Sequence, residues 1–314
     1  MVNTKFYVAV AYAKRGKLLK PEDYAELLTS KDTASLIAKL QLSNKRGDVD
    51  ESISWINEDL VEECSSLRHF SKLTMAYYNR FLIWNIKQAF SSKLAGEKYG
   101  DIAGRLYYLR GAPVGGEELL RKTIDSFTAA EAVALHAGKG YHPYLLEALG
   151  RVEPASSKSM FDFYLDKYFI ASLKAAADRQ SRELVDYEVD SYDAAVRLKG
   201  GLNLEERKRL YIESDIVERC EGEGTVRGVL GYLEKKYPIK FDMQGDIDLD
   251  RTLVAGSYIL AGYQFLKFSR PVVMAYMKLR EQQARNLIGI LTGYKYGLRT
   301  DEIRAALMLG DGTK

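Results

Sequence analysis

The chain has 314 residues, 46% hydrophobic and 28% charged, so it is long enough to bury a sizeable core and has the composition of a globular protein. Its net charge of +3 is too small to indicate a nucleic-acid-binding protein. The two cysteines, Cys64 and Cys220, lie far apart, which predicts small buried side chains in a reducing compartment and not a disulfide framework. The most hydrophobic segment, residues 252–266, is too short and too polar for a direct transmembrane segment.

Helix start signals follow one another along the first part of the chain. Residues 20–23 place a proline and two acidic residues in a first helical turn, and Asp32 or Thr33 can cap the next helix. Residues 44–50 form a polar stretch that predicts a loop. Apolar residues from Trp55 onward continue at helical spacing, which predicts helix up to about Ala89.

Later signals are also helical. Residues 111–116 are rich in glycine and predict an irregular connection, whereas apolar residues within 161–178 recur close to every 3.6 positions. Asn203 has a glutamate three positions later, as in a capping box, and Pro271 opens the last long helix.

Strand signals are weak. Residues 6–12 alternate only loosely, residues 237–250 are interpreted as a loop or short hairpin, and residues 300–303 predict the cap of a final helix. The fold class predicted is therefore all-α.

A repeated helix–glycine turn–helix block is the most specific feature of the sequence. The late copy covers residues 281–304 and a weaker copy covers residues 189–207; each ends a helix in a lysine–glycine turn and restarts one with acidic residues. A third trace is residues 84–87. Asn85, Asp193 and Asn286 take equivalent places, spaced by 108 and 93 residues, which predicts three related helical domains.

The polar side chains of the repeated block are candidates for binding a partner protein, because equivalent turns of three domains can converge on one axis. The candidates are Asn85, Lys87, Asp190, Asp193, Arg197, Lys199, Arg285, Asn286 and Lys295. The alternative is a solvated helix face whose local ion pairs contribute little. The basic segment 207–209 is also interpreted as a solvated face, with lipid headgroups or an acidic partner as the alternative.

Other motifs do not meet the requirements of a calcium, dinucleotide or zinc site. Asp246, Asp248 and Asp250 alternate, but an EF-hand loop from Asp246 would place Arg251 where glycine is required, so a helix-capping loop is predicted. The glycines of residues 222–228 follow no strand, as a dinucleotide site would require. His136 and His142 have no zinc-site spacing. No cofactor, metal or catalytic residue is expected.

Taken in order, the motifs resemble those of the C subunit of archaeal and bacterial A/V-type ATPases, the equivalent of the vacuolar d subunit. The C-terminal pattern of that family falls here on Ser269, Pro271, Tyr276, Glu281, Asn286, Leu287, Gly293, Gly297, Leu298, Glu302, Ile303 and Arg304. Further matches are Leu165-Asp166 with Tyr168-Phe169, Asp190 with Asp193, and an opening formed by Leu18, Leu19, Asp23, Tyr24, Leu27 and Leu28. The resemblance extends over nearly the whole chain.

This resemblance implies a non-catalytic rotor part built from three similar helical domains, residues 1–105, 106–212 and 213–314, in a pseudo-threefold funnel. It implies that a polar mouth receives the tip of the central axle subunits, while the other end sits on the membrane rotor ring. The chain would then lie peripherally on the cytoplasmic face of the membrane. The alternatives are an unrelated all-helical protein-interaction scaffold and an enzyme with a diffuse site.

Overall fold

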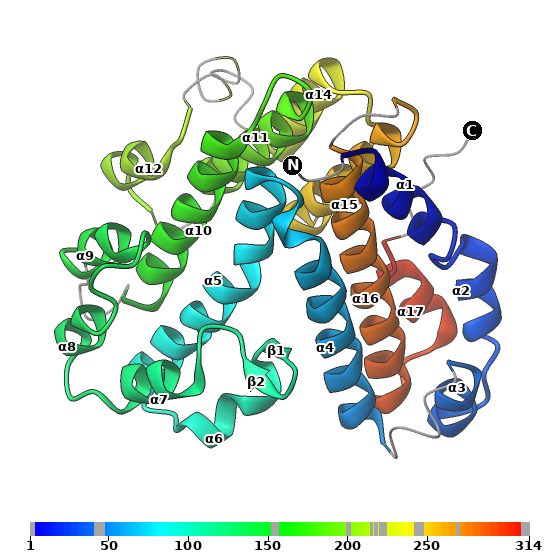
Figure 1. The fold of residues 1–314 in the computed structure, drawn as a ribbon, viewed down its shortest axis with the longest axis horizontal. Coiled ribbons are helices and arrows are strands. Elements are labelled where there is room, and N and C mark those ends of the chain that lie inside the picture. Colours follow the sequence, from blue (N-terminus) through cyan, green and yellow to red (C-terminus); the bar gives the residue numbers. More distant parts are fainter. Residues whose placement is uncertain are drawn as a thin grey trace. The chain divides into compact units, whose positions relative to one another are not determined.

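The computed structural model describes residues 4–40, 48–151, 157–198, 202–213, 216, 219, 225–241, 248–267 and 271–308. The all-α prediction is confirmed, because the regular structure of these residues is helical apart from one short hairpin (Figure 1). The chain divides into two compact units, Met1–Phe70 with Ala261–Lys314, and Ser71–Leu260. These two units are defined by which residues contact one another in space. The division into three domains, residues 1–105, 106–212 and 213–314, is based on the repeated sequence motif and stays a prediction.

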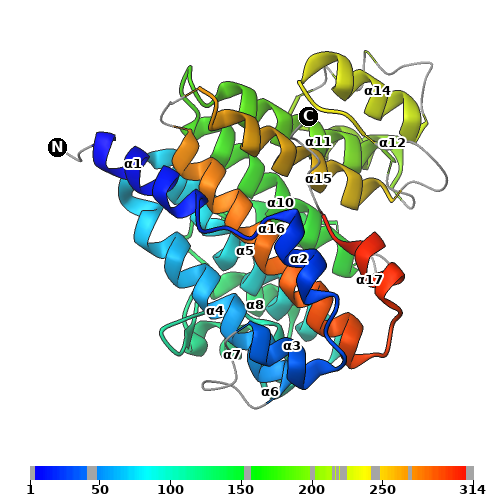
Figure 2. The same cartoon turned by 90° about the vertical axis from the view of Figure 1, so that its right-hand side faces the viewer.

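The first unit is organised around one long helix, α16 (Val272–Lys295), which packs against α1, α3, α4 and α17 (Figure 2). Residues 272–277 of α16 form a continuous run of apolar and aromatic side chains, and all six are buried. The other elements of this unit are α1 (Thr4–Arg15), α2 (Pro21–Leu27), α3 (Thr33–Lys39), α4 (Val49–Leu67), the 3-10 helix η1 (Arg68–Phe70) and α17 (Thr300–Ala306).

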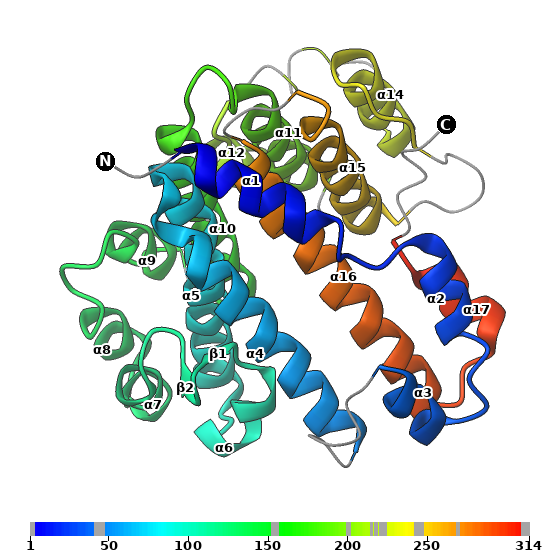
Figure 3. The same ribbon diagram turned by 45° about the vertical axis from the view of Figure 1, so that its right-hand side comes forward.

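The second unit is built on α5 (Lys72–Ala95) and α10 (Ser157–Ala176), which lie along each other (Figure 3). The rings of Phe90 and Phe161 stack between them with centroids 4.6 Å apart. The remaining helices are α6 (Tyr99–Ile102), the 3-10 helix η2 (Ala103–Arg105), α7 (Glu117–Asp125), α8 (Ala129–Ala134), α9 (His142–Leu149), α11 (Arg182–Leu198), α12 (Leu204–Leu210), α14 (Val226–Lys236) and α15 (Leu249–Gln264), whose last four residues belong to the first unit.

A two-stranded antiparallel hairpin is formed by β1 (Tyr108–Leu109) and β2 (Ala112–Pro113). Only β2 lies in segment 111–116, which was predicted to be an irregular connection. Arg110 and Gly111 connect the strands with φ angles of 52° and 76°. Positive φ at both central residues is the geometry of a two-residue type I′ turn, which glycine adopts without strain.

Most predicted helix starts are confirmed. Pro21 is the first residue of α2, and the Asp32 carboxylate caps α3 by accepting from the Ser35 N–H at 2.7 Å. Asn203 caps α12 reciprocally with Glu206, and Pro271 immediately precedes α16. Local capping chemistry therefore places these elements.

The predicted continuous helix through residues 55–89 is wrong at one place. The chain leaves α4 at Leu67 and begins α5 at Lys72, because Ser71 and Thr74 form a reciprocal cap: the Ser71 N–H donates to Thr74 Oγ1 at 2.9 Å and the Thr74 N–H donates to Ser71 Oγ at 3.1 Å. In the predicted loop 44–50, α4 already begins at Val49. α15 likewise begins at Leu249, inside the segment 237–250 that was predicted as a loop or short hairpin. Residues 41–47 and 242–247 lie outside the described residues.

Candidate partner-binding surface

Asn85, the repeat residue on α5, is fully buried and fixes the segment that leads into and out of the hairpin. Its Oδ1 accepts from the Tyr107 N–H at 2.8 Å, and its Nδ2 donates to the carbonyl oxygens of Tyr107 and Val114 at 2.8 and 2.9 Å. One amide thus makes three hydrogen bonds to the backbone on both sides of the hairpin, where the Tyr107 carbonyl also accepts from the Val114 N–H at 2.9 Å.

Asn286, the repeat residue on α16, makes the same kind of contact in the other unit. Its Oδ1 accepts from the Met308 N–H at 2.9 Å and its Nδ2 donates to the Met308 carbonyl at 3.3 Å. Its side chain is 3% exposed. Both Asn85 and Asn286 reach a residue 22 positions further along the chain.

Asp193, the repeat residue on α11, does the same with different chemistry. Its two carboxylate oxygens accept from the Ile212 and Glu213 N–H groups at 2.9 and 2.8 Å. A carboxylate cannot donate, so it bonds two N–H groups where an asparagine bonds one N–H and one carbonyl. Burial, with smaller contributions from the nearby Asp190 and Glu213 carboxylates, raises the pKa of Asp193 to about 7 despite these two bonds, which lower it. We call Asn85, Asp193 and Asn286 the anchor residues.

The turns after the first and third anchor residues correspond position by position. Gly96 and Gly297 stand at the same offset after Asn85 and Asn286, and both adopt the left-handed conformation, with φ of 71° and 68°. Each glycine lies just after a long helix, where a left-handed residue ends it without the strain that a Cβ would introduce.

The short helix that follows each turn also begins in the same way. The backbone N–H of Lys98, Asn203 and Arg299 donates at 2.8–2.9 Å to an acidic residue three positions later, respectively Asp101, Glu206 and Glu302. In the middle copy the capped helix begins three residues sooner after the anchor residue: Asn203 follows Asp193 by 10 residues, whereas Lys98 and Arg299 follow Asn85 and Asn286 by 13. The repeat seen in the sequence is therefore a local structural unit: long helix, turn, capped short helix, and a return segment bonded to a buried anchor residue.

Asp190, one turn before Asp193, is committed to neighbours within its own unit. It is 2% exposed and accepts from the Lys236 ammonium at 2.7 Å and from the Tyr237 hydroxyl at 2.6 Å. Burial, together with this carboxylate, raises the pKa of the Tyr237 hydroxyl well above its ordinary value. Asp190 therefore joins α11 to the end of α14.

The middle and first copies contribute three further candidates. Lys87 Nζ lies 2.9 Å from a carboxylate oxygen of Asp166 on α10; burial favours its neutral form, but Asp166 and Asp162 prevail and raise its pKa. Arg197 is half-buried near the end of α11. Lys199 lies outside the described residues.

Arg285 and Lys295 on α16 are the most exposed of the described candidates. Arg285 pairs with Glu281 at 3.0 Å, and Lys295 pairs with Asp50 at 2.6 Å. The Asp50 hydrogen bond raises the pKa of Lys295. The Lys295–Asp50 pair is exposed and can exchange for contacts with a partner, whereas Arg285 neutralises the carboxylate of Glu281, whose side chain is only 3% exposed.

Two apolar side chains beside Lys295 had not been singled out as contact residues. Tyr296 is 72% exposed and Leu298 is 51% exposed, on either side of the left-handed Gly297. Exposed aromatic and aliphatic groups flanked by cations are typical of protein interfaces. We call Arg285, Lys295, Tyr296 and Leu298 the α16 surface.

The histidines give no sign of a catalytic or metal centre in the described part of the chain. His136 is fully buried; its ring contacts the Thr123 hydroxyl at 2.9 Å and the Tyr141 hydroxyl at 3.1 Å, and burial lowers its pKa to about 4. Among the described residues no three His, Cys, Asp or Glu side chains group as metal ligands. A search of the same residues finds no helix with the length and hydropathy needed to cross a bilayer.

The described residues thus define an all-α protein, apart from one short hairpin, in which the repeated polar residues bond the chain's own turns. Its sequence matches the ATP synthase (C/AC39) subunit family over residues 7–306, and the chain belongs to that family. It is 24% identical over 264 residues to the C subunit of the A-type ATP synthase of Methanocaldococcus jannaschii, an alignment that covers 76% of this chain and 65% of the relative. The chain thus aligns with less than two thirds of that relative's length.

Family membership settles two questions that the sequence left open. Subunits of this family are accessory and not catalytic components of ATP synthases. The two alternatives, an unrelated scaffold and an enzyme with a diffuse site, are therefore set aside.

Proposed function

We propose that the chain is a rotor subunit of an A/V-type ATP synthase that couples the central axle to the membrane rotor ring. Ring rotation, driven by protons or sodium ions, would then turn the axle inside the catalytic head, or the reverse. The observation that carries this proposal is the family match over residues 7–306, joined to the three anchored turns described above. In this proposal the chain binds peripherally, on the cytoplasmic face of the membrane.

A coupling part must transmit torque without deforming, and the anchor residues support such a role. Each of them bonds its own return segment by hydrogen bonds of 2.8–3.3 Å from a buried position. Hydrogen bonds in a low-dielectric interior resist displacement more than exposed ones do. Asn85, Asp193 and Asn286 would thus act by holding the turns, while exposed side chains make the contact with the partner.

The α16 surface is the best-supported place for that contact. Lys295 can exchange Asp50 for an acidic group of the axle, and the exposed side of Arg285 can add a contact while the guanidinium stays paired with Glu281. Tyr296 and Leu298 add apolar area that becomes buried on binding. Lys87, Arg197 and Lys199 are proposed as lesser contacts of the equivalent turns. A contact of this composition is reversible, because much of it is polar.

Calorimetric titration of the chain with its cognate axle subunits tests the proposal. We expect saturable one-to-one binding that Lys295→Glu weakens by roughly tenfold or more, because the change places a second carboxylate beside Asp50 and repels an acidic partner. Lys122→Glu is the matched control, since Lys122 is an exposed lysine in a comparable surface ion pair with Glu118 on α7. No binding to axle or ring would overturn the coupling role; equal weakening by both variants would overturn only the assignment of the α16 surface.

A further inference from the structure

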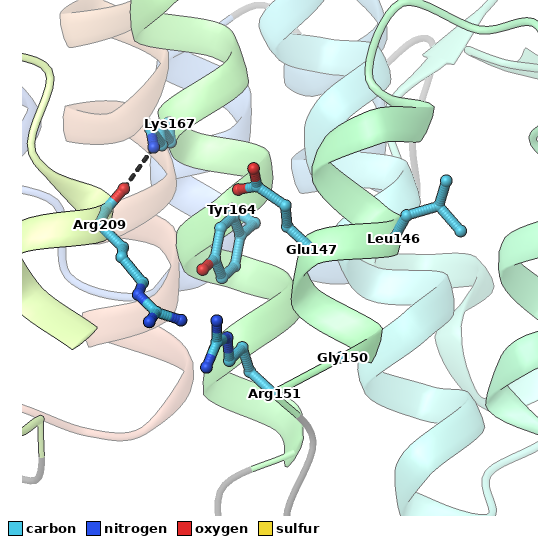
Figure 4. Close-up of a pocket in the computed structure, with 7 residues that line it drawn as sticks. All are labelled: Leu146, Glu147, Gly150, Arg151, Tyr164, Lys167 and Arg209. Carbon is cyan, nitrogen blue, oxygen red and sulfur yellow. Dashed lines mark hydrogen bonds between the residues drawn. The ribbon is translucent and has the colours of Figure 1, made fainter. Parts of the chain in front are cut away.

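A pocket in the second unit contains none of the residues proposed above to contact the axle, although one of its walls is the end of α12, the short helix of the middle repeat. Its volume is about 520 Å³, within the range of sites that hold small molecules. It is lined by α9 and the turn after it, by α10 and by the end of α12 (Figure 4). The lining residues are Leu146, Glu147, Gly150, Arg151, Tyr164, Lys167 and Arg209.

Three cationic side chains and one carboxylate line this pocket. Figure 4 shows the guanidinium groups of Arg151 and Arg209 extending toward each other from opposite walls, below the Tyr164 hydroxyl, with the Glu147 carboxylate directed away from them. No carboxylate of the described residues forms an ion pair with Arg151 or Arg209. Two facing guanidinium groups repel each other unless an anion lies between them.

The walls of the pocket are held in place by its other polar groups. Lys167 on α10 donates from Nζ to the backbone carbonyl of Arg209, which ties the end of α12 to α10 (Figure 4). Tyr164 is 3% exposed, and burial, aided by Glu147, raises its pKa, so its hydroxyl remains a hydrogen-bond donor at neutral pH. The pocket thus presents two guanidinium groups and a phenol to one space that is open to solvent.

We propose that this pocket binds a ligand carrying two or more linked phosphate groups, held by Arg151 and Arg209 with Tyr164 as a further donor. Guanidinium groups bind phosphate oxygens through paired, parallel hydrogen bonds. Two guanidinium groups that face each other can therefore each bind one phosphate of a ligand with linked phosphates. The volume exceeds the space that a single phosphate fills, which favours a polyphosphate chain or a two-phosphate lipid headgroup. Arg209 belongs to the basic segment 207–209, so one member of that segment faces a pocket.

Calorimetric titration of the full chain with sodium tripolyphosphate, at about 50 mM salt, tests the proposal directly because phosphate contacts weaken steeply as salt rises. We expect saturable one-to-one binding that Arg151→Gln and Arg209→Gln each weaken by about tenfold or more. Lys208→Gln is the matched control, since Lys208 adjoins Arg209, is 58% exposed, pairs with Glu205 and does not line the pocket. The absence of saturable binding, or equal weakening in the control, would overturn the proposal.

Further measurements check that the variants fold and distinguish a free polyphosphate from a lipid headgroup. Thermal melts of all variants establish that they fold, and Tyr164→Phe, which removes only the hydroxyl, is expected to weaken tripolyphosphate binding without changing the salt dependence. Co-sedimentation with phosphatidylcholine vesicles containing cardiolipin distinguishes the ligand source. Sedimentation that tripolyphosphate competes away and Arg209→Gln abolishes assigns the pocket to a lipid headgroup; tripolyphosphate binding without sedimentation assigns it to a free polyphosphate.

Discussion

Asn286 and Met308 are joined by two hydrogen bonds: the Met308 N–H donates to Asn286 Oδ1 at 2.9 Å, and Asn286 Nδ2 donates to the Met308 carbonyl at 3.3 Å. Asn85 and Tyr107 repeat this pairing at the same sequence separation of 22 residues. The strongest sequence motif of the chain therefore has a defined structural role, and its chemistry can be tested by exchanging amide and carboxylate.

Asn286→Asp should lower the free energy of unfolding at pH 7 by about 2 kcal/mol, because an ionised carboxylate cannot donate to the Met308 carbonyl and is itself buried. Urea unfolding measures the change. Asn203→Asp is the control: Asn203 is an exposed helix cap, where the two residues cap almost equally well, so a shift below about 0.5 kcal/mol is expected. Similar effects of the two substitutions would argue against the anchoring role.

Asp193 should make stability depend on pH in a defined window. Its folded-state pKa of about 7 lies above the ordinary value of 3.8, so the folded chain binds a proton that the unfolded chain releases between these values. Its contribution to stability is therefore fully present below pH 4 and declines as the pH rises to 7, by up to about 1.4 kcal/mol per pH unit. In Asp193→Asn this decline should be absent.

The measurement is the difference in unfolding free energy between the wild type and Asp193→Asn from pH 4 to 8. Asp248→Asn, a change at an exposed cap of α15, controls for general charge effects. A wild-type minus Asp193→Asn difference that stays level over this range would show that Asp193 titrates as an ordinary exposed carboxylate.

Arg280 is the buried member of a partly exposed ion cluster in the first unit. Its side chain is 8% exposed; Nε bonds Glu63 at 2.7 Å, and Nη2 also bonds Asp59. Glu63 accepts from Lys14 at 2.7 Å as well. Arg280→Leu removes one member of the cluster and should destabilise the chain by about 2–4 kcal/mol, because the mostly buried Glu63 carboxylate, 18% exposed, loses a cation that neutralises it.

A double-mutant cycle with Glu63→Gln checks this result. The two substitutions should together cost less than the sum of their separate effects, since the glutamine removes the charge that Arg280 neutralises. Strict additivity would mean that Arg280 contributes by packing alone.

Gly293 permits the close approach of α17 to α16. A Cβ at this position would lie 2.5 Å from Cγ1 of Ile303, a residue only 2% exposed. Gly293→Ala should therefore destabilise by about 1–3 kcal/mol through overpacking, although alanine is the better helix former. Gly289→Ala on the same helix is the control, because its Cβ would meet nothing within 4 Å and should stabilise the chain by about 0.5–1 kcal/mol. Equal thermal shifts of the same sign would contradict the packing account.

Local chemistry in the sequence predicted the elements better than it predicted the site. The Asn203 cap and the Pro271 helix start are short-range and were identified correctly. The reciprocal cap at Ser71 and Thr74 was equally local and was missed, because the apolar pattern continues across it. The type I′ hairpin was missed because Arg110 is an unusual residue at positive φ.

The burial of the anchor residues was harder to foresee. A polar residue on a helix is expected to face water unless a partner is known, and here the partners are backbone groups, which carry no sequence signal. One signal was present: Gly96 and Asp101 follow Asn85 at the offsets at which Gly297 and Glu302 follow Asn286. The role of the exposed α16 surface in partner binding stays a prediction.

The most direct test of the coupling role uses the assembled ATP synthase with and without this chain, reconstituted into vesicles. ATP hydrolysis and ATP-driven ion uptake are measured on the same preparations. The account predicts that complexes lacking the chain retain hydrolysis by the catalytic head but lose ion uptake, and that adding the purified chain restores it. Full ion uptake without the chain would contradict the account.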